Sequence, residues 1–249
     1  MNWTGQLFNY CERGTDPSFW AEPLNAVSNG AFLVAALLGA RQLAAQPQPA
    51  RQGGAATEWT LVVLAGLVGV GSFLFHTFAT RWAVVTDVGA IFVFTVCSLG
   101  YALRRFFGAS WLGVSGALTV FVAALAAFQK IPCDPGLLPI TAAAGRGCFN
   151  GTLGYAPVLI ALAFYGSRLV LRGHPAGRSI LSAAAVFAIS MAFRTFDIEI
   201  CAMTQFLGRA RGTHALWHMF NAVTVYFLLA AAIRYGARDK TNRALRVEA

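Results

Sequence analysis

Seven stretches of this sequence are long and apolar enough to cross a lipid bilayer as helices. A spanning helix needs roughly 20 mostly apolar residues, because about 30 Å of hydrocarbon is crossed at about 1.5 Å per residue. The stretches cover residues 24–43, 59–78, 82–103, 111–128, 153–171, 180–196 and 214–233. The sequence therefore predicts an all-α integral membrane protein, a bundle of seven transmembrane helices.

The composition also indicates a bilayer rather than water as the surrounding medium. Hydrophobic residues make up 57% of the chain and charged residues 12%, whereas soluble domains carry roughly 25% charged residues. A net charge of +9 can indicate nucleic acid as a partner. Here, arginines in loops that orient a membrane protein explain the charge, so no nucleic-acid partner is expected.

The pattern predicts one domain over residues 1–249, with an N-terminal segment at 1–23 and a tail at 234–249. Residues 1–25 have no basic start followed by an apolar run, so we expect no cleavable signal peptide. With seven spans the two ends lie on opposite sides of the membrane. Most of the 19 Lys and Arg residues fall on the side of the C-terminus. The positive-inside bias therefore predicts a cytoplasmic C-terminus and an extracytoplasmic N-terminus.

The cysteines give a second indication of orientation. Cys11, Cys133, Cys148 and Cys201 all fall on the N-terminal side, and disulfides persist where the compartment is oxidising. Cys133 and Cys148 close one loop, and a bridge from Cys11 to Cys201 would tie the N-terminal segment to the end of the sixth span. Four free thiols placed by chance remain the alternative.

Chemically active side chains gather at the N-terminal side of the membrane. His76 ends the second span, and Ser72 precedes it by about one turn on the same face. His214 and His218 begin the seventh span, four residues apart and on one helix face. Asp87 lies in the second turn of the third span. Since the second span ends on this side and the third and seventh begin there, these residues share one layer.

Three neutral histidines with an open position are typical of catalytic zinc. Zinc lowers the pKa of its bound water toward about 7, which makes hydroxide available as a nucleophile. Asp87 is then the candidate general base, and Ser72 is the candidate donor to the oxyanion. The membrane setting indicates a lipid substrate. Taken singly, Ser72 also fits a packing role between helices, and Asp87 also fits an ion pair with Arg81.

These residues resemble the signature of the superfamily of alkaline ceramidases, progestin/adiponectin receptors and Per1-like membrane hydrolases. The N-terminal stretches at residues 10–12 and 21–29 are similar to the ceramidase branch. The resemblance implies that His76, His214 and His218 bind zinc. It implies that Ser72 and Asp87 assist hydrolysis of ceramide to sphingosine and fatty acid. It also implies a zinc site near the non-cytoplasmic face and a disulfide between Cys11 and Cys201.

The same resemblance implies a calcium site in the N-terminal segment, with candidate ligands Asn9, Tyr10, Glu12, Gly14 and Glu22. Asn9 stands where the family has an aspartate, and Gly14 falls near the position of an asparagine ligand, which Asp16 could replace after a small shift. Calcium takes six to eight oxygens, so the loss of a carboxylate should weaken the site. The alternative is that Glu12 and Glu22 are a solvated pair and an N-terminal helix charge.

Two other functions remain open from the sequence. A related hydrolase of another acyl lipid would use the same catalytic residues. A receptor or lipid-binding protein would keep zinc for structure, although such a site needs neither the serine nor the aspartate. The Ala-, Gly- and Arg-rich composition indicates a bacterial protein of the inner membrane, where ceramide need not be the native substrate. The oligomeric state is left open.

Overall fold

The computed structural model describes residues 2–46, 55–131 and 147–236. Within these ranges, seven helices are long and apolar enough to cross a membrane. The first span joins α1 (Pro23–Ser28) to α2 (Gly30–Ala44). The others are α4 (Ala55–Phe78), α5 (Arg81–Arg105), α6 (Trp111–Phe128), α7 (Ala156–Leu171), α8 (Ala176–Phe196) and α9 (His214–Tyr235). The predicted seven-helix membrane fold is therefore confirmed.

The helix boundaries differ from the predicted ones mainly where polar residues join a helix. α4 begins at Ala55, ahead of the predicted residue 59, and it includes the carboxylate of Glu58. Glu58 is buried, and the hydroxyl of Tyr101 on α5 donates a hydrogen bond to it at 2.6 Å, which offsets part of the cost of burial. α8 begins at Ala176, directly after Pro175, because proline is well tolerated at the start of a helix.

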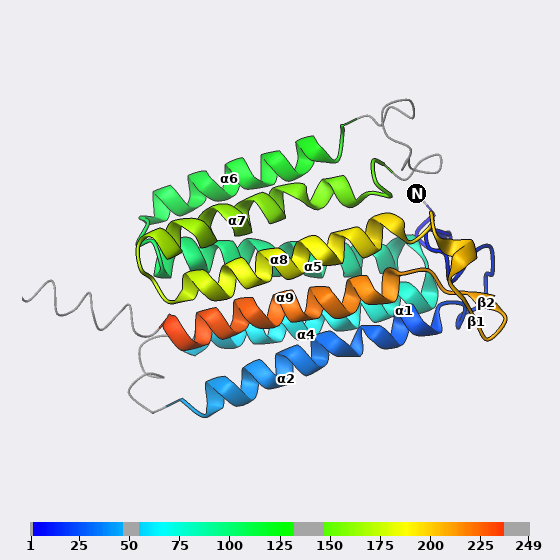
Figure 1. The fold of residues 1–249 in the computed structure, drawn as a ribbon, viewed down its shortest axis with the longest axis horizontal. Helices are drawn as coiled ribbons and strands as arrows, with labels where there is room; N and C mark the ends of the chain where they lie inside the picture. Colours follow the sequence, from blue (N-terminus) through cyan, green and yellow to red (C-terminus); the bar gives the residue numbers. More distant parts are fainter. Residues whose placement is uncertain (1, 47–54, 132–146, 237–249) are drawn as a thin grey trace, which may run out of the picture.

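The helices lie side by side along one axis, with α9 in the interior of the bundle (Figure 1). α9 packs against α8, α2 and α4, and α4 packs against α5 and α2. α6 lies at the edge beside α7 and is the most exposed span. The core between these helices is apolar and includes Phe32, Val68, Phe94, Trp217 and Leu229. α4 and α9, which carry the three predicted histidine ligands, are thus the best-buried spans.

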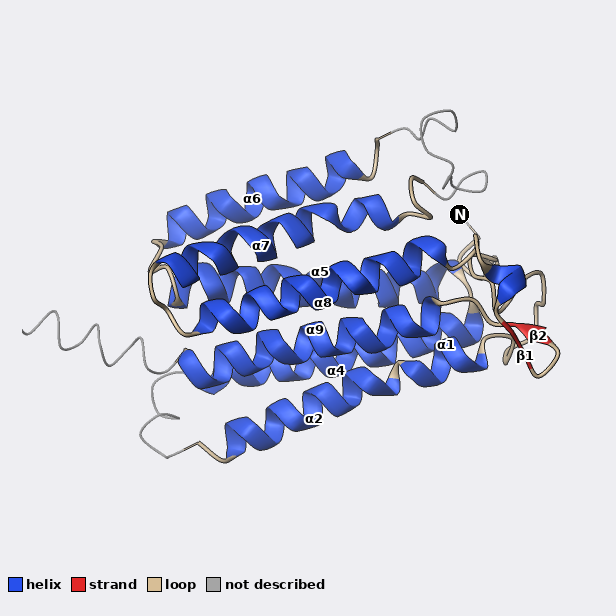
Figure 2. Cartoon of the chain, in the orientation of Figure 1, coloured by secondary structure: helices blue, strands red, loops and turns tan. Residues whose placement is uncertain are grey.

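The end of the bundle that holds the N-terminus is covered by loops and short elements (Figure 2). They comprise residues 2–22, the turns η1 (Thr152–Tyr155) and η2 (Cys201–Met203), and the hairpin of β1 (Gln205–Phe206) with β2 (Arg209–Ala210). The backbone N–H of Leu7 donates to the carbonyl of Ala79 in the α4–α5 turn at 2.7 Å. A disulfide joins Cys11 to Cys201, with Cα atoms 5.6 Å apart. The N-terminal segment is therefore bound to the α4–α5 turn and to η2, which follows α8.

Of the predicted cysteine pairs, Cys11–Cys201 is present. Cys133, like the tail beyond residue 236, lies outside the described residues, so its pairing with Cys148 stays a prediction. Cys97 is a free cysteine within α5.

Candidate metal centre

Three histidine side chains meet inside the bundle at the end covered by the N-terminal segment. His76 lies in the last turn of α4, and His214 and His218 lie in the first two turns of α9. One ring nitrogen from each lies within 4.8 Å of the others. All three side chains are buried, and in the described part of the chain they form the one such group that could hold a metal ion.

Hydrogen bonds to Nδ1 orient two of these three histidine rings. Nδ1 of His76 lies 2.6 Å from Oε2 of Glu22, and Nδ1 of His218 lies 2.8 Å from the hydroxyl of Ser28. Partners of this kind select the tautomer and the ring orientation of metal-binding histidines. Nε2 of His76 is buried and has no hydrogen-bond partner among the described residues. Because Nδ1 of His76 and Nδ1 of His218 are both engaged, Nε2 of each ring is the atom left to bind a metal ion.

The third ring is held by stacking. His214 lies against the ring of Tyr10, with ring centroids 3.8 Å apart, and its Nδ1 has no hydrogen-bond partner in the described ranges. Buried imidazole nitrogens without partners are costly unless something binds them. Imidazole suits zinc and several other transition metals. The donor set therefore fits a transition-metal ion.

Asp87 and Ser72 lie in the same layer, on α5 and α4. Both side chains are buried, and Oδ1 of Asp87 has no hydrogen-bond partner within the described residues. The carboxyl of Asp87 interacts with Ser72 and electrostatically with His76 and Arg194. The structure therefore brings together all five residues that the sequence placed in one layer, and it leaves Asp87 an unused acceptor atom.

A glycine permits this approach of α4 to α5. A Cβ atom on Gly71 would lie 2.5 Å from the carbonyl oxygen of Thr86 and 3.3 Å from the backbone nitrogen of Asp87. The two helix backbones are thus in direct contact at the residues that precede Ser72 and Asp87. Any side chain at position 71 would force the helices apart here.

The start of α9 is held by a carboxylate from the end of α8. Oδ1 of Asp197 accepts hydrogen bonds from the backbone N–H groups of Thr213 and His214 at 2.8 and 2.9 Å. Oδ2 accepts from the backbone N–H of Cys11 at 3.0 Å. Burial raises the pKa of Asp197, an effect that these three hydrogen bonds oppose. Asp197 thereby satisfies the first N–H groups of the helix that carries two of the three histidines.

A buried arginine next to the cluster was not identified from the sequence. Arg194 on α8 donates a hydrogen bond to the hydroxyl of Tyr10 at 3.2 Å. Its guanidinium also lies over the rings of Tyr10, Tyr155 and Trp217. One feature of the sequence could have identified Arg194: it is an arginine in the last turn of an apolar span, where charged residues are often functional.

The predicted calcium ligands are distributed as follows. Glu12 and Glu22 are buried, at 6% and 2% exposure, so the alternative that they are a solvated pair is wrong. Glu12 accepts hydrogen bonds from the backbone N–H groups of Leu24 and Asn25 at the start of α1. Glu12 therefore supplies a negative charge at the N-terminus of α1. Asn9 and Gly14 are on the same segment, and the calcium site stays a prediction.

The electrostatics of Glu22 favour its ionised form. Burial alone raises the pKa of a carboxyl group. The neighbouring His76 and the hydrogen bonds from His76, Asn25 and Arg13 outweigh burial and hold the pKa of Glu22 below its usual range. Burial also raises the pKa of the Tyr10 hydroxyl, so this group stays protonated.

Fold and cluster together define a multi-pass membrane protein with a buried group of three histidines that could hold a metal ion. The family model for ceramidase matches residues 6–247, and the chain therefore belongs to the ceramidase family. Membership supports a hydrolase that acts on the amide bond of ceramide. A comparison with curated proteins finds no match for the chain.

Proposed function

We propose that this protein is a zinc-dependent intramembrane amide hydrolase, a ceramidase that converts ceramide and water to sphingosine and fatty acid. The observation that carries the proposal is the single buried layer of His76, His214 and His218 beside Asp87 and Ser72. The three histidines would hold the zinc ion. When bound, zinc polarises a carbonyl and lowers the pKa of a coordinated water toward about 7.

The two other polar residues have distinct roles in this proposal. Asp87, with its unpartnered Oδ1, accepts a proton from the attacking water. Ser72 donates a hydrogen bond to the acyl oxygen as negative charge develops there. The new C–O bond forms as the C–N bond breaks, and the proton held by Asp87 passes to the departing amine. The products are a fatty acid and the free amine of sphingosine.

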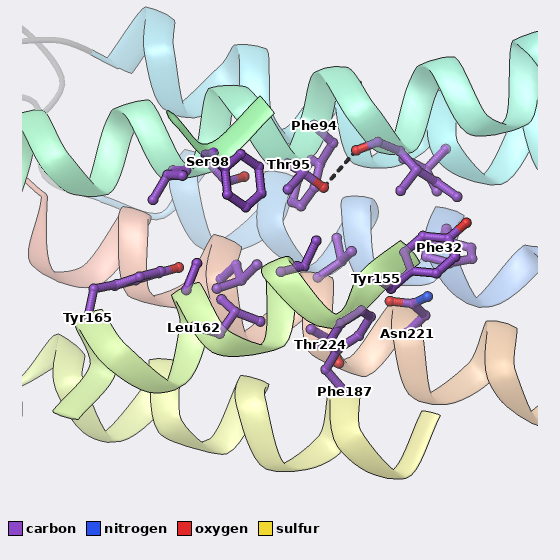
Figure 3. A pocket seen from close by; sticks show the side chains of 18 residues that line it. Phe32, Phe94, Thr95, Ser98, Tyr155, Leu162, Tyr165, Phe187, Asn221 and Thr224 are labelled. Carbon is purple, nitrogen blue, oxygen red and sulfur yellow. Dashed lines mark hydrogen bonds between the residues drawn. The ribbon is translucent and has the colours of Figure 1, made fainter. Parts of the chain in front are cut away.

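An apolar cavity next to this layer supports a lipid substrate. Figure 3 shows side chains from α5 facing those from α7 and α9 across this space. Val68, Ile91 and Asn221 line it and lie about one helical turn from Ser72, Asp87 and His218, toward the opposite face of the membrane. Phe94, Leu162, Phe187 and Val225 make most of its wall apolar. The cavity is where we place the acyl chain while its amide carbonyl lies at the histidines.

The orientation is part of the proposal. We place the metal site and the N-terminus outside the cytoplasm and the C-terminus inside, in a bacterial inner membrane. The disulfide Cys11–Cys201 lies at the metal-site end, as an oxidising compartment would allow. Arginines gather at the opposite end of the helices, in the last turns of α5, α7 and α9.

The test combines metal content with ceramide hydrolysis on the detergent-purified protein. We expect about one zinc per chain and turnover in the wild type, as for a catalytic site with three protein ligands. His218→Ala should lose both, and His174→Ala, in the α7–α8 connection at the other end of the bundle, should lose neither. Asp87→Asn should keep zinc and lose about 10²–10⁴-fold in turnover.

Each result discriminates between the functions left open by the sequence. Normal turnover in Asp87→Asn would remove the proposed base. Zinc without turnover of ceramide, but with turnover of another N-acyl or ester lipid, would keep the mechanism and change the substrate. Zinc without turnover of any acyl lipid would favour a receptor with a structural metal.

A further inference from the structure

Arg13 occupies a cation site built from the oxygens of two segments, the N-terminal segment and the end of α4. Its side chain is fully buried, and its Nε forms an ion pair with Oε1 of Glu22 at 2.5 Å. Arginine has five N–H donors, and here all five are used. The remaining four go to backbone carbonyl oxygens at 2.9–3.3 Å, those of Asp16, Ser18, His76 and Thr77.

This environment resembles that of a hard metal cation, because a carboxylate and backbone carbonyls are the oxygens that calcium prefers. The position is taken by the guanidinium of the chain itself. The second candidate carboxylate is taken as well. Oε1 of Glu12 accepts from Arg211 at 3.0 Å and from Leu24 N–H, and Oε2 accepts from Asn25 N–H.

Calcium does not fit beside these groups. It takes six to eight oxygen ligands with at least some free carboxylate oxygens, and it would be repelled by a neighbouring guanidinium. Both oxygens of Glu12 and both oxygens of Glu22 already accept hydrogen bonds from protein donors. Asn9, Tyr10 and Gly14 add no carboxylate. Both oxygens of the alternative ligand Asp16 accept hydrogen bonds as well, from Ser18 N–H and from Arg209.

We infer that Arg13 is a built-in cation that replaces calcium in this chain and that it positions His76 for metal binding. Arg13 holds Glu22 through Oε1, while Oε2 of the same carboxylate holds Nδ1 of His76. Arg13 also binds the backbone carbonyl of His76. It thus fixes both the main chain and the ring of one ligand, and it does so without touching the metal position.

The first experiment measures calcium on the wild-type protein and does not depend on the substrate. The protein is purified in calcium-free buffer, dialysed with or without 1 mM CaCl₂ (about the range of weak extracellular sites), and passed through a desalting column. Elemental analysis should find no bound calcium, and the melting temperature should be equal in both samples. About one calcium per chain together with a higher melting temperature would overturn the inference.

The second experiment tests positioning with matched arginine variants. Arg13→Met removes all five donors, whereas Arg209→Met removes an exposed ion pair with Asp16 on the same segment. We expect Arg13→Met to lower zinc affinity about 10–100-fold, as for other groups that orient a metal ligand. Arg209→Met should match the wild type.

Arg13→Lys covers the case in which Arg13→Met does not fold. Lysine keeps the charge but offers a compact ammonium with three donors instead of the planar five-donor group. We expect a zinc affinity between those of wild type and Arg13→Met, measured well below the melting temperature of each variant. Wild-type zinc affinity in Arg13→Met, or in Arg13→Lys where that is the variant recovered, would show that Arg13 does not position His76.

Discussion

Gly71→Ala is the change that most directly tests how the helix packing sets the catalytic geometry. The new Cβ would lie 2.5 Å from the carbonyl oxygen of Thr86, which is backbone and cannot swing aside. Ordinary van der Waals contact begins at about 3.5 Å. α4 and α5 must therefore separate locally by about 1 Å to admit a single methyl group.

The separation should affect catalysis more than metal binding. Asp87 moves with α5, whereas Ser72 and His76 stay on α4, so the proposed base is displaced from the site it serves. A misplacement of about 1 Å can lower a rate about 100-fold. Overpacking of this kind costs about 1–3 kcal/mol in stability. The zinc content should remain near that of the wild type, because the three histidines lie on α4 and α9.

The assay compares kcat/KM for ceramide and zinc content across three glycine-to-alanine variants. Gly66→Ala, on the same helix, places its Cβ 3.9 Å from the nearest atom, and Gly89→Ala, on α5, meets no described atom within 4 Å. Both controls should keep wild-type activity. Turnover in Gly71→Ala equal to that of the controls would refute the reasoning, and so would a loss of zinc together with turnover.

Three further changes have defined outcomes. Reduction of Cys11–Cys201 should lower the stability by about 2–4 kcal/mol, so a reducing agent should lower the melting temperature of the wild type. The same agent should leave the melting temperature of a Cys201→Ser variant unchanged. No shift in the wild type would show that the bridge contributes nothing. Asp197→Asn should lower the folding stability by about 1–3 kcal/mol and weaken zinc binding, because the side-chain N–H₂ of the new asparagine then faces a backbone N–H donor. An unchanged melting temperature and zinc affinity would contradict this. Val225→Trp, in the wall of the cavity, should lower kcat/KM for long-chain substrates more than for short-chain ones; an equal loss for both would place the acyl chain elsewhere.

The fold could be predicted from the sequence because the bilayer leaves few choices. Within lipid every backbone polar group needs an internal partner, so each long apolar stretch becomes a helix. The order of the spans then assigns every helix end to one of two sides. For this reason local hydropathy and span order are enough to place the three histidines in one layer with Ser72 and Asp87.

Lateral neighbours and loop contacts do not follow from the sequence. The position of a residue along a spanning helix gives its depth in the membrane, but it does not show which helices are in contact. The 2.5 Å approach at Gly71 is therefore a property of the packed bundle. The same holds for Tyr10, which the sequence offered only as a candidate calcium ligand and whose ring stacks on His214.

The sequence by itself determined the seven spans, their order and the layer in which the polar residues lie, because these follow from local hydropathy and helix geometry. The tertiary structure alone decided the partners of the polar residues at the covered end. Glu22 meets His76 across 54 residues, and Asp197 meets Cys11 across 186. Buried charges must find partners, but which partner each finds depends on how the N-terminal segment folds over the bundle, and no local pattern encodes that.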